Sequence, residues 1–140
     1  MIVVDTNILA YLLIEGDKTA FAQELLRRDG DWHSEAFLLV EFSNLLATTT
    51  RSGRLPAGEA SRLLHAAEVF LDGRMVFVAH TDALDVALRH STSAYDARFL
   101  AAAMIAGRKL ITEDARLRAA APGLTLSLAE ALGSGTVPFA

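Results

Sequence analysis

Short apolar segments alternate with helical patterns along this chain, and that alternation restricts its fold more than any other feature. Strand-like segments lie at Ile2–Val4, Arg74–Ala79, Lys109–Thr112 and Leu124–Leu128, with a weaker one at Asp31–His33. Strands separated by helices predict an α/β protein with a mainly parallel sheet, because parallel neighbours need a long crossover connection. We therefore expect a central sheet of four to five strands flanked by helices.

Apolar residues at helical spacing fill the gaps between these segments. Pro56 suits a first helical turn, Thr81 and Ser93 are candidate N-caps, and Gly107 is a typical helix stop. The helices expected on these grounds are Thr19–Arg28, Ala36–Thr50, Ala57–Leu71, Asp82–Arg89 and Ala94–Ala106. The 140 residues fit one compact domain over residues 1–132, followed by a loose tail at 133–140.

Composition and charge exclude several classes of protein. The chain has no cysteine, so disulfides and thiolate metal sites are excluded. A net charge of −4 argues against a broad basic surface for non-specific nucleic-acid binding. No segment approaches the ~18 apolar residues of a membrane span, so we expect a soluble, cytoplasmic protein without a membrane partner.

Four acidic residues stand in apolar surroundings. Asp5 and Asp114 follow strand-like segments, Glu41 interrupts an apolar helical run, and Asp96 shares a helical face with apolar residues. In open parallel sheets ligands bind beyond the carboxyl ends of strands, where Asp5 and Asp114 are expected. Several carboxylates gathered away from water repel one another, and hard divalent cations relieve that repulsion. The pattern indicates a metal site with oxygen ligands.

Each acid also has a structural interpretation. Asp5 is as well suited to a turn or helix cap after its strand as to binding an ion. Glu41 can reach solvent or pair with an arginine, and Asp96 near a helix N-terminus is stabilised by the macrodipole in any case. These alternatives stay open for each residue taken alone.

The fourth position contains two adjacent acids. Either Glu113 or Asp114 can cap a helix beginning near Ala115. Side-chain alternation places Asp114 on the face of Thr112 and leaves Glu113 in solvent. Arg116 and Arg118, just beyond, are the preferred candidates for contact with phosphate.

Other common catalytic patterns are missing from the sequence. The histidines show no metal-ligand spacing, and the chain has neither a phosphate-binding glycine loop nor a serine-nucleophile elbow. These observations leave the acids as the main chemical signal.

Four motifs together resemble the PIN-domain nucleases, and most closely the VapC-type toxins of toxin–antitoxin modules. They are VVDTNIL around Asp5, LLVEFSNLL around Glu41, SAYDARFLAAA around Asp96 and LITED around Asp114, and the similarity runs from residue 1 to about 128. By this resemblance the four acids are the catalytic and metal-binding quartet. Thr6, Asn7 and Thr112 match the supporting polar positions.

The resemblance also implies an activity, a cofactor and partners. It implies endonucleolytic hydrolysis of RNA by a metal-activated water, with one or two Mg²⁺ or Mn²⁺ ions. It implies a cognate antitoxin, a homodimer, and a heterotetramer or larger assembly with the antitoxin. Ala36–Thr50 and Ala57–Leu71 carry more apolar residues than one inward face requires, which is consistent with a partner groove or a dimer contact.

Two other functions remain compatible with the residues. One is a non-catalytic PIN-like interaction module in which the acids are only structural. The other is a phosphatase with Asp5 as nucleophile. That chemistry usually needs a second aspartate two residues on, where this chain has Asn7.

Overall fold

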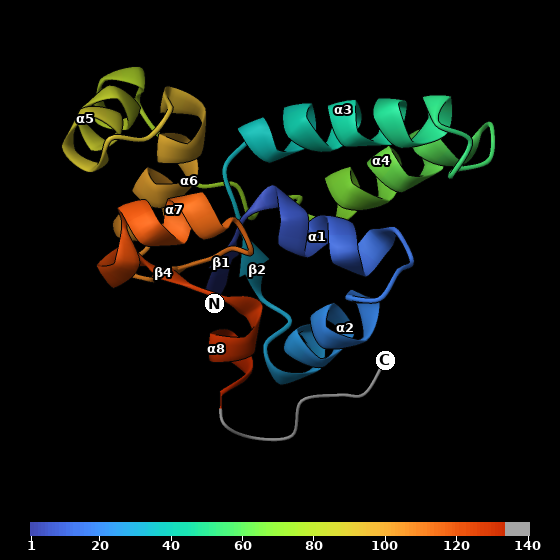
Figure 1. Ribbon diagram of the computed structural model, residues 1–140, viewed down its shortest axis with the longest axis horizontal. Helices are drawn as coiled ribbons and strands as arrows, with labels where there is room; N and C mark the ends of the chain where they lie inside the picture. The colour runs from blue at the N-terminus through green and yellow to red at the C-terminus, as the bar shows by residue number, and fades with distance from the viewer. Residues whose placement is uncertain (134–140) are drawn as a thin grey trace.

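The computed structural model describes residues 1–133, so the predicted tail at 133–140 lies outside the described residues except for its first. Four parallel strands form the central sheet in the order β2-β1-β3-β4, as Figure 1 shows at the middle of the molecule. They are β1 (Ile2–Val4), β2 (Trp32–His33), β3 (Leu110–Ile111) and β4 (Thr125–Leu126). The predicted α/β architecture with a parallel sheet of four to five strands flanked by helices is confirmed.

Helices account for most of the described chain. They are α1 (Thr6–Leu13), α2 (Thr19–Arg28), α3 (Phe37–Arg51), α4 (Glu59–Phe70), α5 (His80–His90), α6 (Ala94–Ile105), α7 (Ala115–Ala120) and α8 (Leu128–Leu132), with a 3₁₀ turn η1 (Pro122–Leu124). In Figure 1, α3 lies along α4 on one side of the molecule, and α5 lies along α6 on the other. The five helices predicted from apolar spacing are confirmed within a few residues at each end.

The strands are short, and each has at least one buried residue. Val3, Val4 and Leu110 are fully buried, and Val3 pairs with both His33 and Leu110 across the sheet. Burial on both faces explains why these segments are continuous apolar runs without alternation. Central β1 therefore holds its last residue, and the Asp5 that follows it, at the carboxyl edge of the sheet.

Three predicted boundaries are wrong. Arg74–Ala79 is no strand, because β2 ends at His33 and offers only one isolated bridge, between Ser34 and Met75. Thr81 is no cap, because α5 already begins at His80 after Ala79. Leu128 starts α8, capped by Ser127 with Glu130 in a capping box, so the last strand stops at Leu126.

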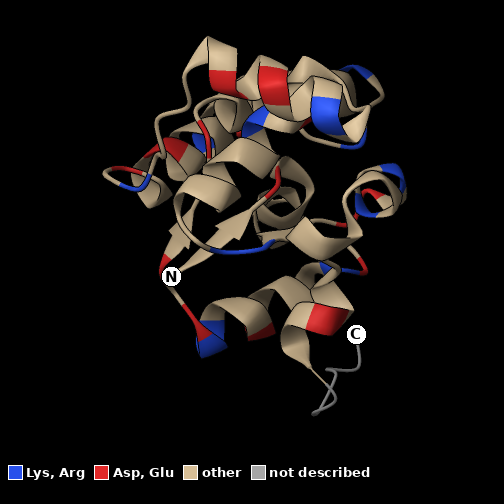
Figure 2. Cartoon of the chain, turned by 90° about the vertical axis from the view of Figure 1, so that its left-hand side faces the viewer, with Lys and Arg blue, Asp and Glu red and all other residues tan. Residues whose placement is uncertain are grey.

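Charged residues are distributed over many elements. Figure 2 shows lysine and arginine interspersed with aspartate and glutamate on the face that it presents, and the basic residues do not gather in one large region of that face. Among residues 1–133, no helix is long and apolar enough to cross a membrane. Residues of both charges are found along the elements in this view, in line with the net charge of −4.

Candidate active site

Asp5 lies where β1 gives way to α1. Its backbone N–H donates to the carbonyl of Ile111 at 2.9 Å, which extends the pairing of β1 with β3 by one residue. Its Oδ1 accepts the backbone N–H of Thr6 at 2.7 Å, so the side chain caps α1. Its Oδ2 accepts the hydroxyl of Thr112 at 2.7 Å. Asp5 therefore both caps α1 and belongs to the site. The lone pairs that these hydrogen bonds leave unused remain available to a ligand.

Two threonines join the acids to one another. The Thr6 hydroxyl donates to Oε1 of Glu41 at 2.6 Å, which ties α1 to α3. The Thr112 hydroxyl, which donates to Asp5, also accepts the backbone N–H of Asp114 at 3.1 Å. Hydrogen bonds to ionised carboxylates are strong and directional, so these hydroxyls fix how the acids point.

Asn7 contributes at the same edge of the sheet. Its Oδ1 accepts the backbone N–H of Glu113 at 3.2 Å and so connects α1 to the segment after β3. It also lines the acidic cavity described next.

The structure brings all four predicted acids together around one cavity of about 220 Å³. Four different segments supply them: the end of β1, α3, the first turn of α6 and the turn before α7. The lining residues are Asp5, Thr6, Asn7, Glu41, Leu45, Asp96 and Asp114. We call this space the acid cavity.

Electrostatics show that these acids act on each other. Burial raises the pKa of Asp5 to about 6, against the lowering effect of Thr112 and Thr6 and with a further increase from the charges of Glu41 and Asp96. Burial also raises the pKa of Glu41, although its bond from Thr6 opposes this, and the charges of Asp96 and Asp114 add to the rise. A site of this kind favours the binding of positive charge.

Asp96 has the same tendency. Burial and the charge of Asp114 raise its pKa, while the hydroxyl of Ser93 lowers it. Ser93 caps α6 by accepting the N–H of Asp96 at 3.0 Å, as predicted from the sequence. The cap leaves the Asp96 carboxylate directed at the cavity that it lines.

The two adjacent acids after β3 have separate tasks. Asp114 lines the acid cavity and caps α7, its Oδ1 accepting from the N–H groups of Arg116 at 3.0 Å and Leu117 at 3.3 Å. Glu113 accepts from Nη1 of Arg118 at 3.3 Å and from the N–H of Leu128 at 3.1 Å. The prediction of a solvated Glu113 is wrong, because these donors hold it with its side chain only 19% exposed.

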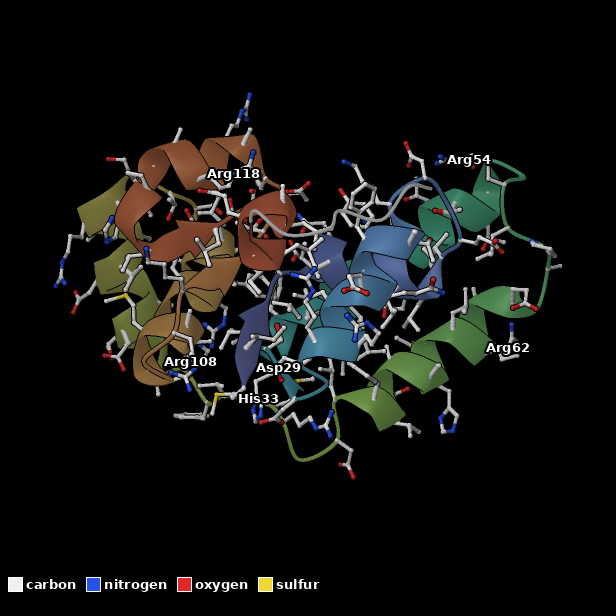
Figure 3. The ribbon with its side chains drawn as sticks, turned by 90° about the horizontal axis from the view of Figure 1, so that it is seen from below. Asp29, His33, Arg54, Arg62, Arg108 and Arg118 are labelled. Atoms are coloured by element: carbon white, nitrogen blue, oxygen red, sulfur yellow. The ribbon has the colours of Figure 1, made fainter. Side chains whose placement is uncertain are left out.

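The two arginines proposed for RNA contact differ in the same way. Arg118, labelled on α7 in Figure 3, also donates from Nη1 to the Thr112 carbonyl at 3.0 Å. Its guanidinium group is therefore engaged in contacts within the fold. Arg116 is exposed at the first turn of α7, next to Asp114. Of this pair, Arg116 is the side chain free to turn towards a phosphate.

The donor set fits Mg²⁺ or Mn²⁺. Within residues 1–133 no three acidic, histidine or cysteine side chains lie close enough together to hold a metal ion jointly, so the acids surround the cavity without meeting at a point. Mg²⁺ keeps several of its waters and needs only one or two carboxylates directly, which suits this open arrangement. Burial is the main reason that the pKa values of three of the acids are raised, and the charges of neighbouring acids add to it; a bound cation would oppose both effects.

Sequence reasoning missed a buried ion pair beside the site. Glu35 is 5% exposed, and its Oε1 lies 3.1 Å from Nε of Arg98. Glu35 Oε2 accepts the N–H of Phe37 at 2.7 Å, and Nη2 of Arg98 donates to the Val78 carbonyl at 2.9 Å. The pair joins the start of α3 to α6, the two helices that carry Glu41 and Asp96. An acid directly before an apolar helix was the available signal.

The fold and the acid cavity define a class of α/β protein whose carboxylates gather beyond the carboxyl edge of a parallel sheet. Comparison with known families makes this specific. The PIN domain family model matches residues 2–122, and the chain belongs to that family. The resemblance inferred from the four sequence motifs is thereby confirmed.

Individual relatives agree with this assignment. Ribonuclease VapC3 of Pyrobaculum aerophilum is 29% identical over 126 residues, which cover 88% of this chain and 96% of that protein. The crystal structure of PAE2754 from Pyrobaculum aerophilum matches with a TM-score of 0.73 at 23% identity, covering 93% of this chain and 92% of the other. FitAcB from Neisseria gonorrhoeae matches with a TM-score of 0.64 at 19% identity, covering 91% and 98%. Both structures show the same fold.

Proposed function

We propose that this chain is a metal-dependent endoribonuclease and the toxin of a toxin–antitoxin module. One observation carries the proposal: four segments of the fold bring Asp5, Glu41, Asp96 and Asp114 to a single cavity. Membership of the PIN domain family and the similarity to Ribonuclease VapC3 support it. A cluster of raised carboxylate pKa values is costly for a purely structural role, which disfavours a non-catalytic module.

In this proposal the four acids hold one or two Mg²⁺ or Mn²⁺ ions. Such ions, when bound, supply the Lewis acidity that activates water and stabilises charge on the leaving oxygen of a phosphodiester. Asp5 and Asp96 contact a cation directly, and Glu41 and Asp114 bind it directly or through its waters. Thr6 and Thr112 keep Asp5 and Glu41 in position, and Arg116 attracts the phosphate backbone of the substrate.

Cleavage of RNA in the presence and absence of metal tests the proposal. We expect the purified chain to cut RNA internally with Mg²⁺ or Mn²⁺ and to stop when EDTA removes the ion, because phosphate cannot approach uncompensated carboxylates. Gel analysis of a defined RNA shows the products, and sequencing of total RNA after induced expression locates the cut sites. Cleavage that persists in EDTA, or none with either ion, would contradict the proposal.

The same proposal includes protein partners. Val40 and Leu45 on α3 and Val69 on α4 are exposed apolar side chains, which agrees with the apolar surplus predicted for these helices. We assign this surface to a small antitoxin, which would compete with RNA because Val40 and Leu45 also line the groove that opens into the acid cavity. We expect a homodimer that forms a heterotetramer or larger assembly with the antitoxin. Sedimentation of the chain, alone and after coexpression with a candidate antitoxin, measures both masses. A monomer in both samples would contradict this part.

An aspartyl-phosphatase reaction is disfavoured by the surroundings of Asp5. Both of its carboxylate oxygens accept hydrogen bonds, from Thr6 and Thr112. Asn7 stands at the position of the acid that such chemistry needs, and its side chain is bonded to the Glu113 N–H.

A further inference from the structure

A groove of about 630 Å³ between α3 and the start of α6 opens directly into the acid cavity. The two spaces share Glu41, Leu45 and Asp96 as lining residues. An RNA whose scissile phosphate reaches the acids can place its neighbouring nucleotide along this groove. The groove therefore belongs to the path of the substrate.

An aromatic pair forms one wall of the groove. The rings of Phe37 and Tyr95 are stacked, with centroids 5.3 Å apart and planes 14° from parallel. Tyr95 directly precedes Asp96 and is 63% exposed, although Phe37 fixes its ring. Exposed aromatic rings held rigidly are the usual platforms on which unpaired bases stack.

Polar groups follow the α3 side of the groove. Asn44 and Thr48 lie one and two turns beyond Glu41, at a spacing that puts them on the same helix face. The Asn44 amide offers both a donor and an acceptor, which is what the edge of a base requires. Arg51 reaches the Thr48 hydroxyl at 3.5 Å and brings a positive charge to the far end.

The charges decide what occupies the groove. Its near end holds Glu41 and Asp96, which repel phosphate but tolerate a neutral base. Its far end holds Arg51, about 15 Å from Glu41 along the helix, which attracts the next part of the backbone. Along the groove the acids come first, then the aromatic wall with the Asn44 amide, and then Arg51. This order matches a scissile phosphate, the base beside it and the next part of the backbone.

We propose that this groove is a nucleobase subsite, in which an unpaired base beside the scissile phosphate stacks on Tyr95 and is read by Asn44. The proposal rests on the proposed ribonuclease function and narrows its substrate to single-stranded or looped RNA. Bases inside a duplex are stacked on their neighbours and cannot enter the groove.

Kinetics with matched variants test the subsite. Tyr95→Ala is expected to lower kcat/KM on a short single-stranded RNA by about 10- to 100-fold, since base–aromatic stacking has that weight. Tyr95→Phe keeps the ring and is expected to stay within about twofold of wild type. Phe77→Ala removes an even more exposed ring outside the groove, at 85% exposure, and is expected to leave kcat/KM unchanged.

Asn44→Ala tests whether Asn44 recognises the base. Unlike Tyr95, Asn44 is not a sequence neighbour of Asp96. This variant is expected to show a weaker preference for the nucleotide beside the cut. The same RNA in duplex form is expected not to be cleaved by any of the variants. Wild-type kinetics for Tyr95→Ala would overturn the subsite. A Tyr95→Ala protein that cuts normally but changes its oligomeric mass would also overturn it and assign the groove to a protein contact.

A binding measurement separates this inference from the ribonuclease proposal. In an Asp5→Asn background, a short single-stranded RNA carrying 2-aminopurine is expected to lose fluorescence on binding, because stacking on Tyr95 quenches that base. Adding Tyr95→Ala is expected to abolish the quenching. Quenching without cleavage by the wild type would sustain the base site and refute the nuclease. Cleavage without Tyr95-dependent quenching would sustain the nuclease and refute the base site.

Discussion

Replacing Asp5 with asparagine is expected to reduce RNA cleavage at least about a hundredfold while leaving the protein folded, since loss of a supporting residue alone costs up to that much. The variant loses the charge that binds metal but keeps an oxygen to accept the Thr6 N–H and so to cap α1. Initial rates on one RNA, with circular dichroism of the same sample, measure both effects. Cleavage at the wild-type rate would remove Asp5 from the catalytic site.

The same substitution is expected to stabilise the metal-free protein at neutral pH. The folded-state pKa of Asp5 is raised to about 6 from 3.8, so between these values the folded state binds more protons than the unfolded state. The stability that protonated Asp5 contributes to the folded state is therefore fully present below pH 3.8, and it is lost as the pH rises through about 6. Above that, ionised Asp5 costs up to about 3 kcal/mol, from 1.36 kcal/mol for each pKa unit. Asp5→Asn removes this cost.

Urea unfolding of both proteins in EDTA, from pH 4 to pH 7.5, measures this difference. Asp29→Asn is a matched control, because the N–H of Asp31 lowers the pKa of Asp29 and the change is expected to weaken the fold at neutral pH without affecting cleavage. An Asp5→Asn protein less stable than wild type at pH 7.5 would show that the acid is not strained in the absence of metal.

Breaking the Glu35–Arg98 pair is expected to have the largest effect on stability. Arg98→Met leaves Glu35 charged and buried without its partner, which costs about 3 kcal/mol or more. Combining it with Glu35→Gln is expected to restore most of that loss, because the amide oxygen still accepts the Phe37 N–H without carrying a charge. The free energies of unfolding of the four proteins give the coupling directly.

An exposed pair on α4 provides the control for this cycle. Arg62 donates to Glu59 at 2.6 Å, but its side chain is 72% exposed and projects from α4 in Figure 3. Solvent screens such a pair, so Arg62→Met is expected to have a far smaller effect. If Arg98→Met costs no more than Arg62→Met, the buried pair does not hold α3 and α6 together.

Local sequence was sufficient for the features that depend on burial alone. Asp5 and Asp114 were placed at strand ends because the apolar runs before them lie in a sheet covered on both faces. Glu41 was found because it interrupts an apolar helix, and Ser93 because caps have a local chemical signature. The convergence of the acids was then a consequence of parallel-sheet geometry.

Features that depend on a distant partner were missed or misread. Arg74–Ala79 is a short apolar run typical of a strand, but a strand needs a hydrogen-bonded neighbour, and β2 is too short to provide one. The helix α1 was not predicted, because Thr6–Leu13 is mostly apolar and its cap is the same Asp5 assigned to the site. Glu113 looked solvated because Arg118 and Leu128 approach it only in the folded chain.

The bond between Thr112 and Asp5 spans 107 residues of sequence. A chain still being synthesised holds Asp5 from the start, yet it has no β3 to pair with β1 until residue 111 has left the ribosome. The four acids cannot come together before β3 and Asp114 have been synthesised, because β3 pairs directly with β1 and Asp114 follows it. A copy of the chain that stops before Asp114 therefore lacks a complete acid cavity.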